Sequence, residues 1–280
     1  RLDFKLDSDF KSKFYDSDRV EFHQKDIRDL NFMNQQIRKG DYVVNLAALV
    51  GEPLCKIKPE EAIEVNFEAA KNLADLCKEK NISKFIQLST CSNYGQAKEM
   101  VGEDGELFPT SLYAETKVNL EKYLIQNISN ATVLRCATAY GLSVGRMRFD
   151  LLVSDFIKEA WLEKQINVFM PEVHRPIVHV SDISDAILLC IEHEGILSRV
   201  YNVGSSIQNY TKRQIAEKVS DRLNVPLNII EKEDKRDYIV NFDRIKNELN
   251  FSTKFLAEDG IEEMVKILED GSFDLEQSNV

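Results

Sequence analysis

The sequence predicts an α/β protein in which a doubly wound parallel sheet is joined to a smaller α+β domain. The chain has 280 residues, and domains of about 150 residues are typical, so two domains are expected. Hydrophobic residues make up 43% of the chain and charged residues 30%, as in a globular protein with a substantial core. In the first half, short apolar runs alternate with helical patterns. That order indicates parallel strands joined by crossover helices.

Four apolar runs in the first half predict strands, and two amphipathic patterns between them predict helices. The first helix begins at Pro59, and Glu60 follows where the helix dipole favours negative charge. Lys78 lies in its last turn, and Asn81 can adopt the left-handed conformation that ends a helix. Ligands of such sheets bind at the carboxyl ends of the strands. The predicted strands are residues 20–24, 41–46, 84–89 and 131–136, and the helices are residues 59–80 and 112–126.

The rhythm loosens after about residue 142, as expected for a smaller α+β domain. We therefore assign residues 1–141 to the first domain, to which later segments can return, and residues 142–280 to the second. The polar end, GSFDLEQSNV, is expected to fray. The predicted strands are residues 166–169, 177–180, 200–203 and 227–230, and the helices are residues 149–164, 183–192, 211–223 and 256–268.

Charge and hydropathy exclude several classes of function. The chain carries 36 Lys and Arg against 47 Asp and Glu, a net charge of −11, which disfavours nucleic acid as a partner. No apolar run approaches the roughly 18 residues of a membrane span, and the first residues lack the apolar core of a secretory signal. We expect a cytoplasmic protein with no nucleic-acid and no membrane partner.

The cysteines and histidines indicate no metal site. The five cysteines are an odd number without a C-x-x-C pair, and most lie in or beside apolar runs. Buried free thiols in a reducing compartment explain them better than disulfides or zinc. The four histidines show no H-x-x-x-H spacing.

The sharpest local signal is the pair Tyr113 and Lys117 in the sequence YAETK. Four residues apart on a helix, the two side chains share a face. An ammonium near a phenol stabilises the phenolate and lowers the pKa of the tyrosine, which suits it to act as a general base. Tyr94 and Lys98 have the same spacing, but Gly95 follows the tyrosine and the context indicates a loop.

Two neighbouring strand ends support this interpretation. The segment LSTCSNYG begins at the end of a predicted buried strand and places a hydroxyl, Thr90, where it can meet a substrate oxygen. The segment NLAA (45–48) ends the preceding strand with small residues, which let a flat cofactor approach the backbone. The alternative is that Thr90 caps a turn and the alanines pack against a helix. The coincidence of three such features at successive strand ends favours a site.

In order along the chain, nine motifs resemble those of extended short-chain dehydrogenases/reductases, in the NAD-dependent epimerase/dehydratase family that acts on nucleotide sugars. The resemblance covers nearly the whole chain and implies a Rossmann-like sheet, a bound NAD (NADP being the alternative) and a nucleotide-sugar substrate. It also implies a homodimer, formed by the helices predicted at residues 59–80 and 112–126. The motifs are KDIRD (25–29), NLAA (45–48), EVNFEAAKNL (64–73), LSTCSNYG (88–95), YAETK (113–117), LRCATAYG (134–141), RPIVHVSD (175–182), YNVGS (201–205) and KRDY (235–238).

By position in these motifs, the resemblance implies a role for each candidate residue. Tyr113 is the base, Lys117 holds the nicotinamide ribose, and Thr90 takes the place of the catalytic Ser/Thr. The implied cofactor contacts are Asp26 and Ile27 at the adenine, with Leu46, Ala47, Ala48, Asn66, Ser89, Cys136 and Ala137 along the rest of the molecule. The implied substrate contacts are Thr90, Thr138, Arg146, Arg148, Arg175 and Arg236; the last two clamp the diphosphate, for which arginine is the preferred donor, unless they are solvated surface residues.

One departure from the family lies at the start of the chain. The opening strand and the G-x-x-G-x-x-G turn that holds the cofactor pyrophosphate are absent, since the first glycine is Gly40. We expect that roughly the first βα unit of the sheet precedes Arg1 in a longer protein. The acidic residue that separates NAD from NADP enzymes would also precede Arg1.

A second departure concerns the reaction. Sugar 4,6-dehydratases of this family carry acidic residues directly after the catalytic threonine, where this chain has Cys91 and Ser92. Dehydration is therefore disfavoured, and oxidation of a sugar hydroxyl, at C4, is expected. The residues leave open whether the outcome is epimerisation or dehydrogenation; some segments also resemble bacterial GDP-heptose 4-dehydrogenases. A reductase of a small carbonyl compound and a non-catalytic protein that kept the fold remain as alternatives.

Overall fold

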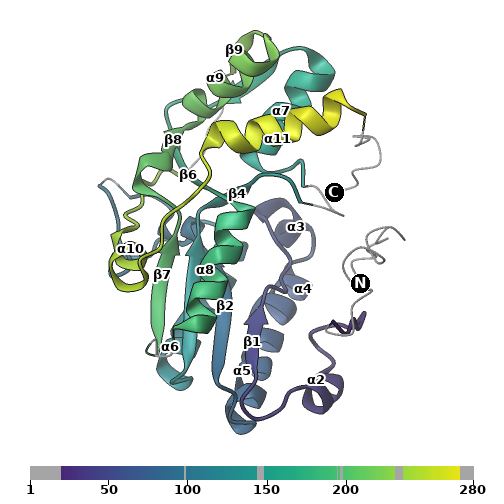
Figure 1. The fold of residues 1–280 in the computed structure, drawn as a ribbon, viewed down its shortest axis with the longest axis vertical. Helices are drawn as coiled ribbons and strands as arrows, with labels where there is room; N and C mark the ends of the chain where they lie inside the picture. The colour runs from purple at the N-terminus through teal and green to yellow at the C-terminus, as the bar shows by residue number, and fades with distance from the viewer. Residues whose placement is uncertain are drawn as a thin grey trace.

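The computed structural model describes residues 20–97, 99–143, 148–193, 195, 198–230 and 236–271. Its lower part is a four-stranded parallel sheet in the order β1-β2-β3-β7 (Figure 1). Each strand pairs in register with its neighbour, for example Phe85 with Ala131 between β2 and β3. The strands are β1 (Tyr42–Asn45), β2 (Lys84–Thr90), β3 (Ala131–Cys136) and β7 (Arg199–Val203).

Helices cover both faces of this sheet. Successive residues of β2 and β3 are buried in different cores: Phe85 and Val133 pack in one hydrophobic cluster, and Ile86 and Leu134 pack in another. Alternation of this kind shows that both faces are covered, which is typical of doubly wound parallel sheets. The predicted α/β class is thus confirmed. On one side lie α5 (Ala70–Glu79) and α6 (Leu112–Asn127), and on the other lies α8 (Val180–Glu192) (Figure 1).

The helix predicted at residues 59–80 is interrupted by a wider turn. It begins at Pro59 as expected, but its middle is a π-helical segment, Glu64–Ala69, between α4 (Pro59–Ile63) and α5. Asn66 lies in that segment and is 1% exposed. Its side chain accepts from Leu49 N at 2.7 Å and donates to Leu49 O at 3.0 Å. The π turn therefore positions an amide that holds the chain after β1, in keeping with the frequent occurrence of such turns at functional sites.

The second part of the molecule lies at the carboxyl ends of the strands. Its core is formed by three helices packed around short strands (Figure 1). The helices are α7 (Leu152–Glu163), α9 (Lys212–Leu223) and α11 (Ala257–Glu269); the strands are β4 (Thr138–Tyr140), β6 (His174–His179) and β8 (Asn209–Thr211) in one sheet and β5 (Ile166–Phe169) and β9 (Leu227–Ile230) in another.

Several elements differ from the prediction. Residues 20–24 form no strand, because this exposed segment has no strand beside it among the described residues. The strand predicted at 200–203, after the boundary at residue 142, pairs with β3 in the first sheet. Three short helices were missed: α2 (Leu30–Gln36), α3 (Glu52–Ile57) and α10 (Asp243–Leu249). Residues 272–280, expected to fray, lie outside the described residues.

Candidate functional site

A cleft of about 660 Å³ lies where the parallel strands end and the second part of the molecule begins. Strand ends, α6 and the chain following β4 all contribute to its wall. It brings together most of the residues predicted for the site. Those that line it are Leu46, Ala48, Ser89, Thr90, Tyr113, Lys117, Cys136, Ala137, Thr138, Arg148, Arg175 and Arg236.

Helix α6 presents Tyr113 and Lys117 to this cleft. Ser111 begins the helix, since its side chain accepts from Ala114 N at 3.3 Å. Lys117 is 4% exposed, and its Nζ lies 5.9 Å from the centroid of the Tyr113 ring. Within the described residues its Nζ donates one hydrogen bond, to Leu88 O at 3.1 Å. An ammonium has three donors, so Lys117 keeps donors for a ligand in the cleft.

Burial governs the protonation of this pair. Desolvation raises the pKa of Tyr113 well above its usual range, and the charge of Arg148 opposes this rise. Desolvation lowers the pKa of Lys117 to about 8, opposed by the negative charge of Glu121. The spacing alone predicted that the lysine would lower the pKa of the tyrosine, and this is wrong for the structure, because removal from water disfavours both charged forms.

The segment after β2 brings hydroxyl groups to the same wall. Thr90 ends the strand, and its side chain accepts from Ser92 N at 3.1 Å, so it caps the 3₁₀ turn of Cys91–Tyr94 while also lining the cleft. Ser92 lines the cleft too, and its Oγ lies 3.3 Å from the OH of Tyr238. Thr90 therefore caps the turn and lines the cleft at the same time, so the two interpretations of this residue are compatible.

Four of the predicted cofactor residues do not line the cleft. The carboxylate of Asp26 is bound by the Arg28 guanidinium at 2.7 and 2.9 Å, which lowers the pKa of that carboxyl to about 2. Ile27 is buried in the core, and Ala47 is exposed at the end of β1. Asn66 binds the backbone of Leu49 as described above, so it holds the chain that follows β1 without lining the cleft itself.

Cationic side chains also line the cleft. Arg175 is 5% exposed, and its Nη1 donates to Arg236 O at 2.7 Å, so one arginine fixes the backbone of the other. Arg148 forms an ion pair with Asp150. Lys212 also lines the cleft and was missed, although it follows a short strand just as the other site residues do. Arg146 lies outside the described residues.

The donors and small side chains along the strand ends fit a dinucleotide. Ala48 and Ala137 leave room against the backbone, and Lys117 offers donors suited to ribose hydroxyls. All five cysteines are free and buried, as predicted. Among the residues described, no group of three or more His, Cys, Asp or Glu side chains is arranged to hold a metal ion. Within the same residues, none of the helices has the length and hydropathy to span a membrane.

Comparison of the sequence identifies related proteins. Residues 5–204 match the model of the NAD dependent epimerase/dehydratase family. The UDP-glucose 4-epimerase of Rickettsia bellii (strain OSU 85-389) is 26% identical over 200 residues, which are 69% of this chain and 54% of the relative. The inverting UDP-N-acetylglucosamine 4,6-dehydratase of Campylobacter jejuni is 29% identical over 137 residues, 48% of this chain and 37% of the relative. The chain thus spans about half the length of the curated relatives it matches.

Solved structures share the fold. The UDP-glucose 4-epimerase of Thermotoga maritima, crystallised with UDP-glucose, superposes with a TM-score of 0.80 at 22% identity, covering 93% of this chain and 88% of that one. The dTDP-glucose 4,6-dehydratase DesIV of Streptomyces venezuelae, crystallised with NAD, gives a TM-score of 0.83 at 19% identity, covering 96% and 86%. The Rossmann-like architecture predicted from the motifs is confirmed.

Proposed function

Because the chain belongs to the NAD dependent epimerase/dehydratase family, we propose that it oxidises a hydroxyl of a nucleotide sugar, at C4, with NAD as the hydride acceptor. One observation carries the proposal: Thr90, Tyr113 and Lys117 line the same cleft as Arg148, Arg175 and Arg236. A proton-transfer group and anion-binding side chains in one cleft suit a sugar attached to a diphosphate.

Tyr113 is the proposed base, and its surroundings determine whether its phenol can lose a proton. In the cleft as described, burial keeps the phenol protonated. It can accept a proton from a sugar hydroxyl only when nearby positive charge lowers its pKa. Arg148 is the cation in the cleft whose charge already lowers the pKa of the phenol. Thr90 would hold the sugar hydroxyl between itself and Tyr113.

The residues have separate tasks around the two ligands. NAD, when bound, supplies the hydride acceptor. Lys117 would donate to its ribose hydroxyls, with Ala48, Cys136 and Ala137 along the strand ends forming the surface beneath it. Arg175 and Arg236 would bind the diphosphate of the substrate, since guanidinium groups pair with phosphate oxygens through two parallel hydrogen bonds.

The outcome of the reaction is proposed to be epimerisation or release of the ketone. The 4-epimerases among the relatives support C4 as the reacting carbon. Cys91 and Ser92 follow Thr90 where an acid–base pair would be needed to remove water, and neither is a carboxylic acid. The arginines that line the cleft argue against a small uncharged carbonyl compound as the substrate.

The test is replacement of Tyr113 by Phe, with Tyr123→Phe as the matched control. Both tyrosines are on α6, but Tyr123 OH donates to Asp75 outside the cleft. The protein is incubated with NAD and a panel of UDP-, GDP-, dTDP- and CDP-sugars, and sugar carbons are followed by NMR and NADH by absorbance. Tyr113→Phe is expected to lose about 100-fold or more in turnover, whereas the control retains it. Undiminished turnover in Tyr113→Phe removes this tyrosine from the mechanism.

A homodimer is also proposed. The helices at residues 59–80 and 112–126 are the expected contact. Ile63 on the first of them and Ile57 just before it are 43% and 76% exposed, and contiguous exposed apolar surface is typical of protein interfaces. Light scattering of the protein checks this proposal, since the mass of a single chain would contradict it.

A further inference from the structure

A buried ion pair lies beneath the cleft and has no role in the proposed chemistry. Glu121 is on α6, four residues after Lys117, and it faces Arg135 on β3. The two side chains are 3% and 6% exposed, and Arg135 Nε and Nη2 lie 2.9 and 2.8 Å from Glu121 Oε2. Charges buried in this way are costly unless fully paired, so the reason for keeping them here needs to be found in what else they contact.

The second oxygen of Glu121 holds the segment that carries Thr90. Ser89 Oγ donates to Glu121 Oε1, and Asn93 Nδ2 donates to the same oxygen at 2.7 Å. Ser89 directly precedes Thr90, and Asn93 directly follows Ser92. The carboxylate of Glu121 therefore accepts hydrogen bonds from residues before and after Thr90 and Ser92, the two hydroxyl residues that line the cleft. It joins the strand end to helix α6, from which Tyr113 and Lys117 project.

Glu121 also lies one helical turn after Lys117 on α6, so the two side chains share a face of the helix. Its negative charge raises the pKa of the lysine against the effect of burial. The other titratable groups that act on the ammonium are the thiols of Cys55 on α3 and Cys136 on β3, both of which are buried and hold raised pKa values. Thiols in that state are neutral near pH 7. Glu121 is thus the negatively charged group that raises the pKa of Lys117 against the effect of burial.

We propose that Glu121 is a positioning residue of the catalytic site, which fixes the Thr90 segment against α6 and supplies the negative charge that balances Lys117. The expected effect of Glu121 on turnover rests on the proposed function. The expected effect of Glu121 on the pKa of Lys117 is independent of any substrate.

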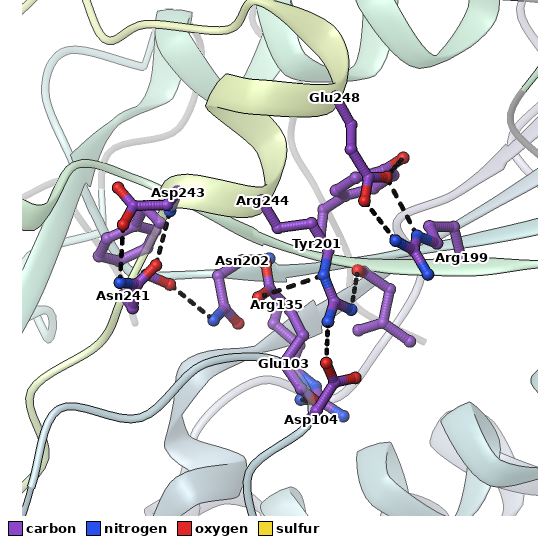
Figure 2. A network of polar contacts seen from close by, with 12 residues as sticks. Glu103, Asp104, Arg135, Arg199, Tyr201, Asn202, Asn241, Asp243, Arg244 and Glu248 are labelled. Carbon is purple, nitrogen blue, oxygen red and sulfur yellow. Dashed lines mark hydrogen bonds and ion pairs between the residues drawn. The ribbon is translucent and has the colours of Figure 1, made fainter.

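The surroundings of Arg135 explain how the pair is tolerated. Arg135 Nη1 donates to Tyr94 OH at 3.0 Å and to Glu103 O at 3.1 Å, so the guanidinium is bonded on its other side as well. Figure 2 shows the outer part of this network, in which Arg244 points toward Asp104 and Glu248 faces Arg199. A fully bonded network costs far less than a buried unpaired charge.

The test replaces Glu121 by Gln, which keeps the shape of the side chain and removes its charge. Lysine labelled with ¹³C at the ε carbon reports the titration of Lys117 by NMR, assigned with a Lys117→Arg sample. Removing an adjacent opposite charge is expected to lower the pKa of Lys117 by about 1 unit or more. The control is Glu248→Gln: Glu248 also pairs with a guanidinium through two hydrogen bonds, that of Arg199 on the edge strand β7.

The pH dependence of turnover supplies a second readout, which a purely structural role of Glu121 would not change. If the pKa of Lys117 falls from about 8 to about 7, its charged fraction at pH 8 falls from about one half to about one tenth. Turnover is then expected to fall about fivefold at pH 8 and far less near pH 6, so that the alkaline limb of the pH profile moves down by about one unit. Glu121→Asp is expected to restore part of the charge effect.

Folding is controlled with the paired variant Glu121→Gln/Arg135→Met, which removes the buried guanidinium that Glu121→Gln alone leaves without its carboxylate. Lys117 still loses its balancing carboxylate there, so its pKa is again expected to fall. An unchanged titration of Lys117 in the folded single or paired variant overturns the proposal. If the wild-type protein turns over no nucleotide sugar, the proposed function fails, whereas the titration still decides the role of Glu121.

Discussion

Replacement of Lys117 by Met should flatten the dependence of stability on pH. The pKa of Lys117 is about 8 in the folded protein, against its ordinary value of 10.5. Because the folded value is the lower one, the unfolded chain binds more protons between these two values, and stability rises with pH. The shift of 2.5 units corresponds to about 3 kcal/mol of destabilisation while the lysine is charged in both states.

The size of the effect over an accessible range follows from the same two values. Of the roughly 3 kcal/mol, about 1 kcal/mol is regained between pH 7 and pH 9, and most of the rest by pH 10.5. Other groups act in the opposite direction above pH 9, because burial raises the pKa of Cys77 to about 12 and of Cys190 to about 11. Those thiols are present in both proteins, so the difference between wild type and Lys117→Met isolates the lysine.

The assay is urea unfolding at several pH values from about 6.5 to 9. Lys117→Met is expected to be more stable than wild type at pH 7, with a gap that narrows by about 1 kcal/mol at pH 9. The prediction concerns how the stability difference between the two proteins changes with pH. Its size at any single pH also includes the loss of the hydrogen bond from Lys117 to Leu88 O. Lys122→Met, an exposed lysine on the same helix, serves as the control. A gap between wild type and Lys117→Met that is constant over this range would refute the reasoning.

Two further substitutions test the framework of the site. Asn66→Ala removes the side chain that binds both backbone groups of Leu49; a loss of about 1–3 kcal/mol is expected in urea unfolding, and a loss below about 0.5 kcal/mol contradicts the role given to the π turn. Gly141→Ala should cost more than about 1 kcal/mol, because φ is +105° and the new Cβ would lie 2.1 Å from His179 Nε2; Gly40→Ala, at φ +87° with open space around it, separates backbone strain from that clash.

The sequence predicted short apolar strands best, because their patterns are local. Residues 131–136 and 227–230 form strands with the predicted bounds. The run at 20–24 shows the limit of such patterns, since alternation of apolar residues indicates a strand only where another strand lies alongside. The short helix α3 was missed because six residues containing a proline give too little periodicity to recognise.

The site was predicted in its composition more fully than in its electrostatics. Tyr113, Lys117 and Thr90 were placed by motif and spacing, and the cleft contains all three. The direction of the pKa shift at Tyr113 was wrong, because spacing gives the neighbour of a group but not the water it loses. Lys212 was missed, since its approach to the cleft depends on the packing of distant segments. The same holds for the pairing of Glu121 with Arg135.

The two electrostatic results have a common physical origin. A lysine in a dry cleft destabilises the fold while it carries its charge, and it is useful to a base only while it does. Without a nearby carboxylate, burial would lower the pKa of Lys117 further, and the fold would gain stability as the lysine lost its charge. Glu121 opposes this change at its own cost of burial, which Arg135 offsets. The buried pair therefore acts through the lysine, because the titration of Lys117 sets both the alkaline limb of turnover and part of the pH dependence of stability. Removing the carboxylate should move that limb to lower pH. Removing the lysine should remove its contribution to the pH dependence of stability.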